Sequence, residues 1–117
     1  MAGLLPKLEC RFYRMPSGHE PVRRWLLDLS SDERQEIGAD IRRAQWRWPV
    51  GRPLVGTFGR GLYEVRSSLR GDIYRVLFCV RQDTMVLLHG FKKKTVAVPA
   101  GDLALARRRQ HEVERSE

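Results

Sequence analysis

The sequence contains few cysteines, few lysines and no long apolar run, and these shortages exclude several classes of protein. Its two cysteines, Cys10 and Cys79, lie far apart and lack the CxxC spacing of a metal site, so neither a disulfide framework nor a structural zinc site is expected. We interpret both as buried thiols. No apolar stretch approaches the ~18–20 residues that a transmembrane helix needs, and the N-terminal residues lack the apolar core of a secretory signal. We therefore expect a cytoplasmic protein with no membrane partner.

Motifs for metal or cofactor chemistry are also missing. The three histidines, His19, His89 and His111, fall in different predicted elements, and no cluster of carboxylates accompanies His89. No glycine-rich phosphate loop leads into a helix, and the pair Ser67 and Ser68 lacks the sequence context of a catalytic serine. The sequence therefore predicts a protein that uses neither a metal nor a cofactor.

Arginine is what the sequence has in excess. Lysine and arginine together number 22 against 14 acidic residues, which gives a net charge of +8, and 18 of the 22 are arginines. The excess is confined to residues 42–94, where 12 basic residues face three acidic ones. Because a guanidinium binds two phosphate oxygens at once, this charge predicts a polyanionic partner such as nucleic acid. An acidic protein partner, or a solvated surface in an arginine-rich proteome, would account for the same charge.

The chain length and the hydrophobic periodicity predict a single α+β domain over residues 1–117. Loose alternation over residues 5–14 predicts a first strand. A helical hairpin follows, with a first helix that Ser17 would cap and a second helix that begins at Ser30 or Ser31 and ends before Pro49. The apolar stripes of the two helices are Val22, Trp25, Leu26 and Leu29, and Ile37, Ile41, Ala44 and Trp48.

The second half of the chain is richer in strand patterns. Residues 50–61 contain four glycines and one proline, and we interpret them as an irregular loop. Three β-forming runs over residues 62–67, 73–80 and 85–91 predict a three-stranded antiparallel meander. Residues 102–114 predict a C-terminal helix with a weak apolar stripe, which either docks on the sheet or belongs to the interface with a partner.

Strand periodicity divides the meander into two faces, because successive side chains point to opposite sides. The residues that we expect to pack against the helical hairpin are Tyr63, Val65, Tyr74, Val76, Phe78, Val80, Val86 and Leu88. The opposite face, which we expect to be free of helices, would carry Arg66, Arg75, His89, Phe91 and Lys93, with Met85 and Leu87. A guanidinium in a strand as apolar as residues 73–80 needs a partner or an open face. A structural salt bridge from Arg75 to Glu64 is the alternative to a functional role.

Several residues of this polar face have the chemistry needed to act on a nucleic acid. Cations beside His89 would favour its neutral ring, which accepts a proton, although a lone histidine on a strand also serves as a packing residue. Phe91 either stacks on an unpaired base or belongs to the core. The run Lys92, Lys93 and Lys94 either binds phosphate or is a solvated charge run.

A resemblance to a known family is carried by two segments, GLYEVRSSLRGDIYRVLF and VLLHGFKKKT, and by the ALARRR that follows a proline-containing linker. These segments are similar to the phage-derived HigB-like branch of the RelE/ParE toxin superfamily, and EVR, YRV and HGFKKK are the most specific parts. The resemblance implies a RelE-like fold and the toxin of a type II toxin–antitoxin pair. Its expected partners are a cognate antitoxin, a helix-turn-helix protein similar to HigA, and the ribosome with its mRNA.

The resemblance also implies an activity, that of an endoribonuclease (mRNA interferase) that cuts mRNA on the ribosome without a metal and so inhibits translation. At the matching positions, Arg66 and Arg75 would hold or stabilise phosphate, and His89 and Lys93 would transfer protons. The RNA contacts that we expect are Arg60, Arg70, Phe91, Lys92 and Lys94. Two alternatives stay open: a toxin of the same fold that inhibits DNA gyrase by binding, and a degenerate toxin that only binds RNA.

Overall fold

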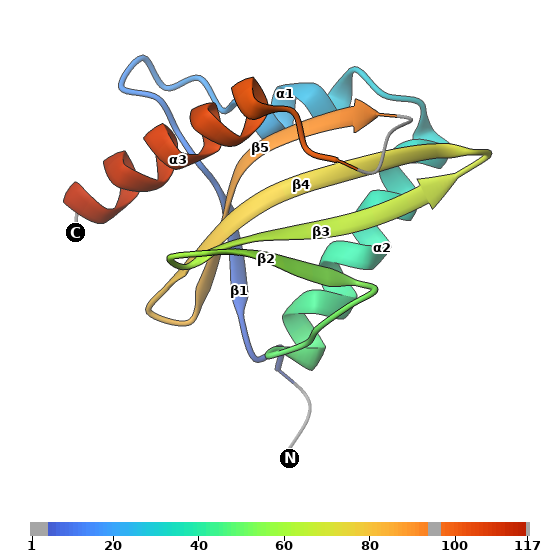
Figure 1. Ribbon diagram of the computed structural model, residues 1–117, viewed down its shortest axis with the longest axis horizontal. Coiled ribbons are helices and arrows are strands. Elements are labelled where there is room, and N and C mark those ends of the chain that lie inside the picture. The colour runs from blue at the N-terminus through green and yellow to red at the C-terminus, as the bar shows by residue number, and fades with distance from the viewer. Residues whose placement is uncertain (1–4, 94–96, 117) are drawn as a thin grey trace.

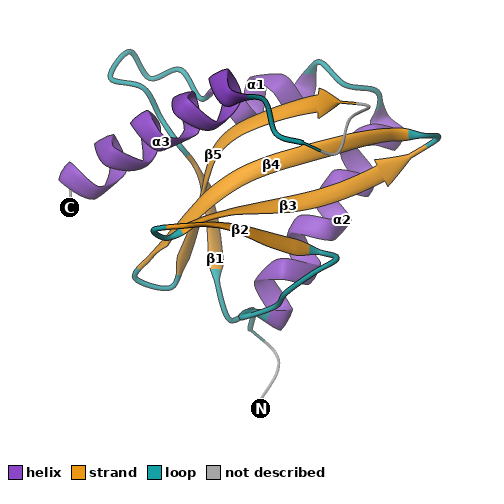
Figure 2. Ribbon diagram, viewed as in Figure 1, coloured by secondary structure: helices purple, strands orange, loops and turns teal. Residues whose placement is uncertain are grey.

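The computed structural model describes residues 5–93 and 97–116 and contains a five-stranded sheet with helices on both faces (Figure 1). The strands lie in the order β1-β5-β4-β3-β2, and β1 is parallel to β5 whereas all other neighbours are antiparallel. The strands are β1 Glu9–Phe12, β2 Val55–Gly59, β3 Leu62–Leu69, β4 Asp72–Arg81 and β5 Thr84–Lys93. The helices are α1 Pro21–Leu27, α2 Ser31–Arg47 and α3 Ala100–Arg115 (Figure 2). The predicted α+β class and RelE-like order of elements are confirmed.

The hairpin of α1 and α2 covers one face of the sheet, as the helical spacing predicted. Its core joins Val22, Ile37, Ile41 and Ala44 of the helices to Val65, Tyr74, Val76 and Phe78 of the strands. Ser30 caps α2, because its hydroxyl accepts from the Glu33 N–H at 3.2 Å and the Glu33 carboxylate accepts from the Ser30 N–H at 2.9 Å. The prediction that Ser17 caps α1 is wrong. That helix begins after Glu20 with Pro21 in its first turn, where a residue without an N–H leaves no donor to satisfy.

The segment predicted as an irregular loop contains strand β2, so four strands and not three form the antiparallel part of the sheet. Gly56 of this strand pairs with Glu64 of β3. A Cβ at Gly56 would lie 3.3 Å from Cγ of Glu64, so the glycine leaves room for the glutamate side chain. The turn to β3 uses Gly59, Arg60 and Gly61, all with positive φ. The glycines that suggested a loop therefore serve a strand and its tight turn.

The C-terminal helix docks on the other face of the sheet, so the prediction that this face is free of helices is wrong (Figure 1). Ala106 and Val113 of α3 pack on a second core, whose strand residues are Leu62, Leu77, Cys79, Val86, Leu88 and Phe91. Gln110 of α3 donates to the carbonyl of Arg60 at 2.8 Å, which ties the helix to the β2–β3 turn. The apolar stripe of α3 looked weak because few residues carry the contact and the sheet supplies the rest.

A β-bulge in β5 changes the predicted faces of that strand. Leu77 of β4 pairs with His89 while Phe78 pairs with Leu87, so Leu88 is the extra residue. Before the bulge the prediction is inverted, since Met85 and Leu87 join the core of the hairpin whereas Val86 and Leu88 pack beneath α3. After the bulge the alternation is reset, and Phe91 lies on the predicted side of the sheet, although α3 covers that side.

No helix among the described residues is long and apolar enough to cross a membrane. Of the two cysteines, Cys79 is buried as predicted, whereas Cys10 is exposed. The difference follows from position, because Cys79 lies on the central strand β4 and Cys10 lies on β1 at the edge of the sheet.

Candidate functional site

Arg66, Arg75 and Phe91 lie side by side on three neighbouring strands, as the periodicity predicted. Arg66 is opposite Arg75 in the sheet register, and Arg75 is opposite Phe91. Lys93 follows two residues later on β5. Phe91 lies beneath α3, whereas the ends of β3 and β4 nearest their shared turn extend past that helix (Figure 1). We call Arg66, Arg75, His89 and Lys93 the basic face.

The two arginines of the basic face share one carboxylate. Arg75 is 2% exposed and its Nη1 donates to Oε1 of Glu64, which is also buried. Nε of Arg66 lies 3.9 Å from the same oxygen, and the Arg66 side chain is 28% exposed. The salt bridge from Arg75 to Glu64 that the sequence offered as an alternative is therefore present. Arg66 is the arginine of this pair that a ligand can reach.

His89 is held by a carboxylate from α3. Its Nε2 lies 2.6 Å from Oδ1 of Asp102, and both side chains are half-buried. The imidazole also stacks on the ring of Phe91, with centroids 5.4 Å apart and planes at 28°. When Nε2 carries the proton and donates to Asp102, the neutral ring has Nδ1 as its acceptor. Asp102 was not among the predicted site residues. Its signal in the sequence is an acidic residue in the first turn of the last helix.

Lys92 points to the opposite side of the sheet, where it joins a polar cluster at the start of α2. Its Nζ lies 3.1 Å from Oδ2 of Asp72 and 3.4 Å from Oε2 of Glu33. The hydroxyl of Tyr74 donates to Glu33 at 2.6 Å. This hydrogen bond, together with those from Ser30, lowers the pKa of Glu33 to about 2. The cluster ties β4 and β5 to α2, so Lys92 has a structural role in addition to any contact with RNA.

The other residues predicted to contact RNA are dispersed. Arg70 lies in the β3–β4 turn and pairs with Asp32 at 2.8 Å, and both side chains are exposed. Arg60 is exposed in the β2–β3 turn, at the opposite end of β3. Phe91 is 8% exposed, so its ring belongs to the core beneath α3, which was one of its two predicted positions. Lys94 lies outside the described residues.

The basic face combines cations with an imidazole and a carboxylate. Across residues 5–93 and 97–116, no group of three His, Cys, Asp or Glu side chains gathers in the manner of metal ligands. The side chains of the basic face can bind an anion through Arg66, with positive charge from Arg75 beneath it, and can transfer a proton through His89.

Comparison with known proteins relates most of the chain to one family. A family model described as phage derived protein Gp49-like (DUF891) matches residues 24–111, about three quarters of the chain, and includes every residue of the basic face. A search of curated proteins found no match. Because the family model covers α2, the whole of β2–β5 and most of α3, the match extends over the elements that build the site. The chain therefore belongs to the Gp49-like family of phage-derived proteins, a family of RelE/toxin-like proteins.

Proposed function

We propose that the protein is the toxin of a type II toxin–antitoxin pair, in the HigB-like branch of the RelE superfamily, with residues 1–117 as one toxin domain. The proposed activity is cleavage of mRNA on the ribosome without a metal, which inhibits translation. Membership of a RelE/toxin-like family supports the general class. The observation that carries the proposed activity is the basic face, where the reachable Arg66 and the His89–Asp102 pair occupy the same side of the sheet.

The proposed reaction is attack of a ribose 2′-hydroxyl on the neighbouring phosphate. A bond forms between the 2′ oxygen and phosphorus, and the bond from phosphorus to the 5′ oxygen breaks, which leaves a cyclic phosphate and a 5′-hydroxyl. His89 takes the proton of the 2′-hydroxyl at the ring nitrogen that does not contact Asp102. Lys93 gives a proton to the departing 5′ oxygen. General acid–base catalysis of this kind contributes about 10²–10⁴-fold.

The two arginines have different proposed roles, because their exposure differs. Arg66 contacts the phosphate and donates to the oxygens on which negative charge develops. Arg75 is buried against Glu64, so it acts from beneath through its charge and by holding Glu64 in place. Removing a donor that is fixed in advance at such a charge costs about 10²–10³-fold in other enzymes.

The proposed partners are the ribosome with its mRNA and a cognate antitoxin in the cytoplasm. A RelE/toxin-like family suggests an antitoxin, and we propose that it is a helix-turn-helix protein similar to HigA. The exposed Arg60 and Arg70 are proposed to contact RNA outside the basic face. Phe91 is buried, so we expect a smaller effect on RNA binding from it than from the exposed Arg60. Lys92 and Arg70 each pair with a carboxylate, so their effects should lie between these two.

Primer extension on cellular mRNA after induction tests the proposal. We expect cuts in translated mRNA with the wild-type chain, and about 10²–10³-fold fewer with Arg66→Ala. Arg23→Ala is the matched control, because Arg23 is exposed on α1, on the opposite face of the sheet, and its substitution removes the same charge. Full cleavage by Arg66→Ala would refute the site, and DNA damage without mRNA cuts would favour the gyrase alternative. If the wild-type chain neither stops growth nor cuts mRNA, the remaining alternative is a degenerate toxin that only binds RNA.

A further inference from the structure

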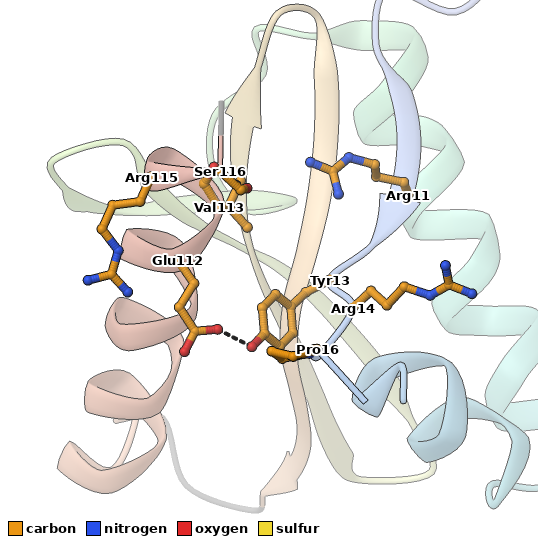
Figure 3. Close-up of a pocket in the computed structure, with 8 residues that line it drawn as sticks. All are labelled: Arg11, Tyr13, Arg14, Pro16, Glu112, Val113, Arg115 and Ser116. Atoms are coloured by element: carbon orange, nitrogen blue, oxygen red, sulfur yellow. Dashed lines mark hydrogen bonds between the residues drawn. The ribbon is translucent and has the colours of Figure 1, made fainter. Parts of the chain in front are cut away.

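A cavity of about 520 Å³ lies between β1, with the loop that follows it, and the last turns of α3 (Figure 3). Its floor is formed by the buried Tyr13 and Val113, and the exposed Pro16 also lines it. We call it the β1–α3 groove. Glu112 of the groove lies ten positions after Asp102, which corresponds to about 15 Å along a helix that rises ~1.5 Å per residue.

The floor of the groove is fixed in place by contacts within the protein. Tyr13 is 5% exposed, and its hydroxyl donates to Glu112 of α3 (Figure 3). Burial and this hydrogen bond raise the pKa of Tyr13, so the phenol keeps the proton that it donates. The guanidinium of Arg109 lies over the same ring, 5.3 Å from its centroid. A ligand would therefore meet a surface that is already ordered, which reduces the cost of binding.

The rim of the groove is basic on both sides. Arg11 and Arg14 come from β1 and its loop, and Arg115 comes from the last turn of α3. Arg11 reaches across toward α3, whereas Arg14 and Arg115 extend outward (Figure 3). Arg14 is exposed and lies 3.9 Å from Glu20, a loose contact that a stronger anion can replace. Cations on both sides of an apolar floor favour an elongated partner that carries negative charge.

We propose that the β1–α3 groove binds an acidic segment of a partner protein, with one apolar side chain on the floor and carboxylates beside the rim arginines. Tyrosine and arginine are the residues that most often dominate protein interfaces. A nucleic acid fits less well, because Tyr13 is only 5% exposed and Arg109 already lies over its ring, which leaves no aromatic face on which a base could stack. That the partner is the antitoxin rests on the proposed function, whereas the chemistry of the segment rests on the groove alone.

Amide NMR spectra of the purified full chain test the groove with defined probes. The first probe is a terminally blocked pentapeptide, a leucine flanked on each side by two glutamates. One matched peptide has glycine in place of leucine, and another has lysines in place of the glutamates. We expect the first probe to shift the amides of Tyr13, Val113 and Arg115, and the other two to bind at least about tenfold more weakly.

Charge reversal on the protein tests the rim. The variant Arg14→Glu with Arg115→Glu should bind the glutamate–leucine peptide at least about tenfold more weakly than the wild type. The matched control is Arg42→Glu with Arg47→Glu, because both arginines are exposed on α2 at the opposite face and the net charge changes equally. We expect the control to bind as the wild type does.

Each other outcome would overturn the docking proposal. Absence of shifts at millimolar peptide, equal binding of the lysine peptide, or equal weakening by the control pair would show that the groove does not recognise acidic segments. Tighter binding of a short single-stranded RNA at the same amides would assign the groove to nucleic acid. Cleavage of mRNA is measured in a separate assay. A chain that cuts no mRNA can therefore still bind the acidic peptide, and a chain that does not bind the peptide can still cut mRNA.

Discussion

Replacing Glu64 by leucine removes the carboxylate that two arginines of the sheet share. The side chains of Arg75 and Glu64 are 3% and 7% exposed, so the variant leaves a guanidinium in the protein interior without that carboxylate. Removing one partner of a buried ion pair costs about 3–5 kcal/mol. Arg66 and Arg75 are also opposite in the register, and like charges that face each other across strands add up to about 1 kcal/mol. A loss of this size is a large fraction of the ~5–15 kcal/mol that stabilises a typical domain.

Urea unfolding followed by circular dichroism measures this loss. We expect Glu64→Leu to be less stable by about 3–5 kcal/mol, which lowers the melting temperature by roughly 12–20 °C for a chain of this size. The double variant Glu64→Leu with Arg75→Met should recover most of that loss, because an apolar pair that replaces a buried ion pair is often neutral or stabilising. The matched control is Arg70→Met, which breaks an exposed pair with Asp32 and should cost at most ~1 kcal/mol.

A cost for Glu64→Leu no larger than that of the Arg70→Met control would refute the reasoning, because it would show that water reaches the Arg75–Glu64 pair in solution. The result also decides how variants of the basic face are interpreted. If the pair is buried, loss of toxicity in Arg75→Ala reports instability as well as chemistry. Arg66→Ala is then the cleaner test of the site, since Arg66 is partly exposed.

Three further predictions concern the elements around the site. The pKa of Glu33 is lowered from 4.5 to about 2, so its contribution to stability is complete above about pH 4.5 and is lost as the pH falls toward 2. Urea unfolding at several pH values should show this loss of stability in the wild type and not in Glu33→Gln. Gly90→Ala would place a Cβ in overlap with the Trp25 ring, 2.6 Å from its Cζ3 atom, and should destabilise the fold by about 1–3 kcal/mol. Trp25→Leu in the same chain should recover part of this loss. Asp102→Asn should change the tautomer of His89 seen in ¹⁵N NMR and lower mRNA cleavage by at most the ~10²–10⁴-fold of acid–base catalysis, whereas unchanged cleavage would remove Asp102 from the proposed site.

Local signals predicted the helical hairpin well, because both the period and the cap lie within a few residues of sequence. Ser30 with Glu33 is a complete capping box, and its two hydrogen bonds are present. Ser17 with Glu20 has the same spacing, yet α1 begins only at Pro21. The spacing alone cannot separate the two cases, because what decides is where the chain leaves β1 and turns onto the sheet.

Strand β2 was missed because its glycines have a reason that appears only in the folded sheet. Gly56 makes room for the Glu64 side chain, which must reach across the face to Arg75. Gly59 accompanies the turn to β3 with a positive φ. A sequence window that contains glycines at both positions is typical of a loop. The ion pair between Glu64 of β3 and Arg75 of β4 therefore explains why β2, the neighbour of β3, has a glycine at position 56.

The bulge at Leu88 shows why the polar face was predicted with the right residues but the wrong surroundings. Strict alternation placed His89 and Leu88 on opposite faces of the sheet, yet both side chains lie on the face that α3 covers. The prediction failed because the extra residue in β5 is visible only in its pairing with β4. The carbonyl of Leu88 accepts from Arg109 of α3 at 2.9 Å, so the helix that covers this face also satisfies the bulge. His89 is consequently reached from the border of a packed core and not from an open sheet. At the proposed site, Arg66 should therefore affect substrate binding more strongly than His89 does, because the side chain of Arg66 is 28% exposed and that of His89 is 16% exposed.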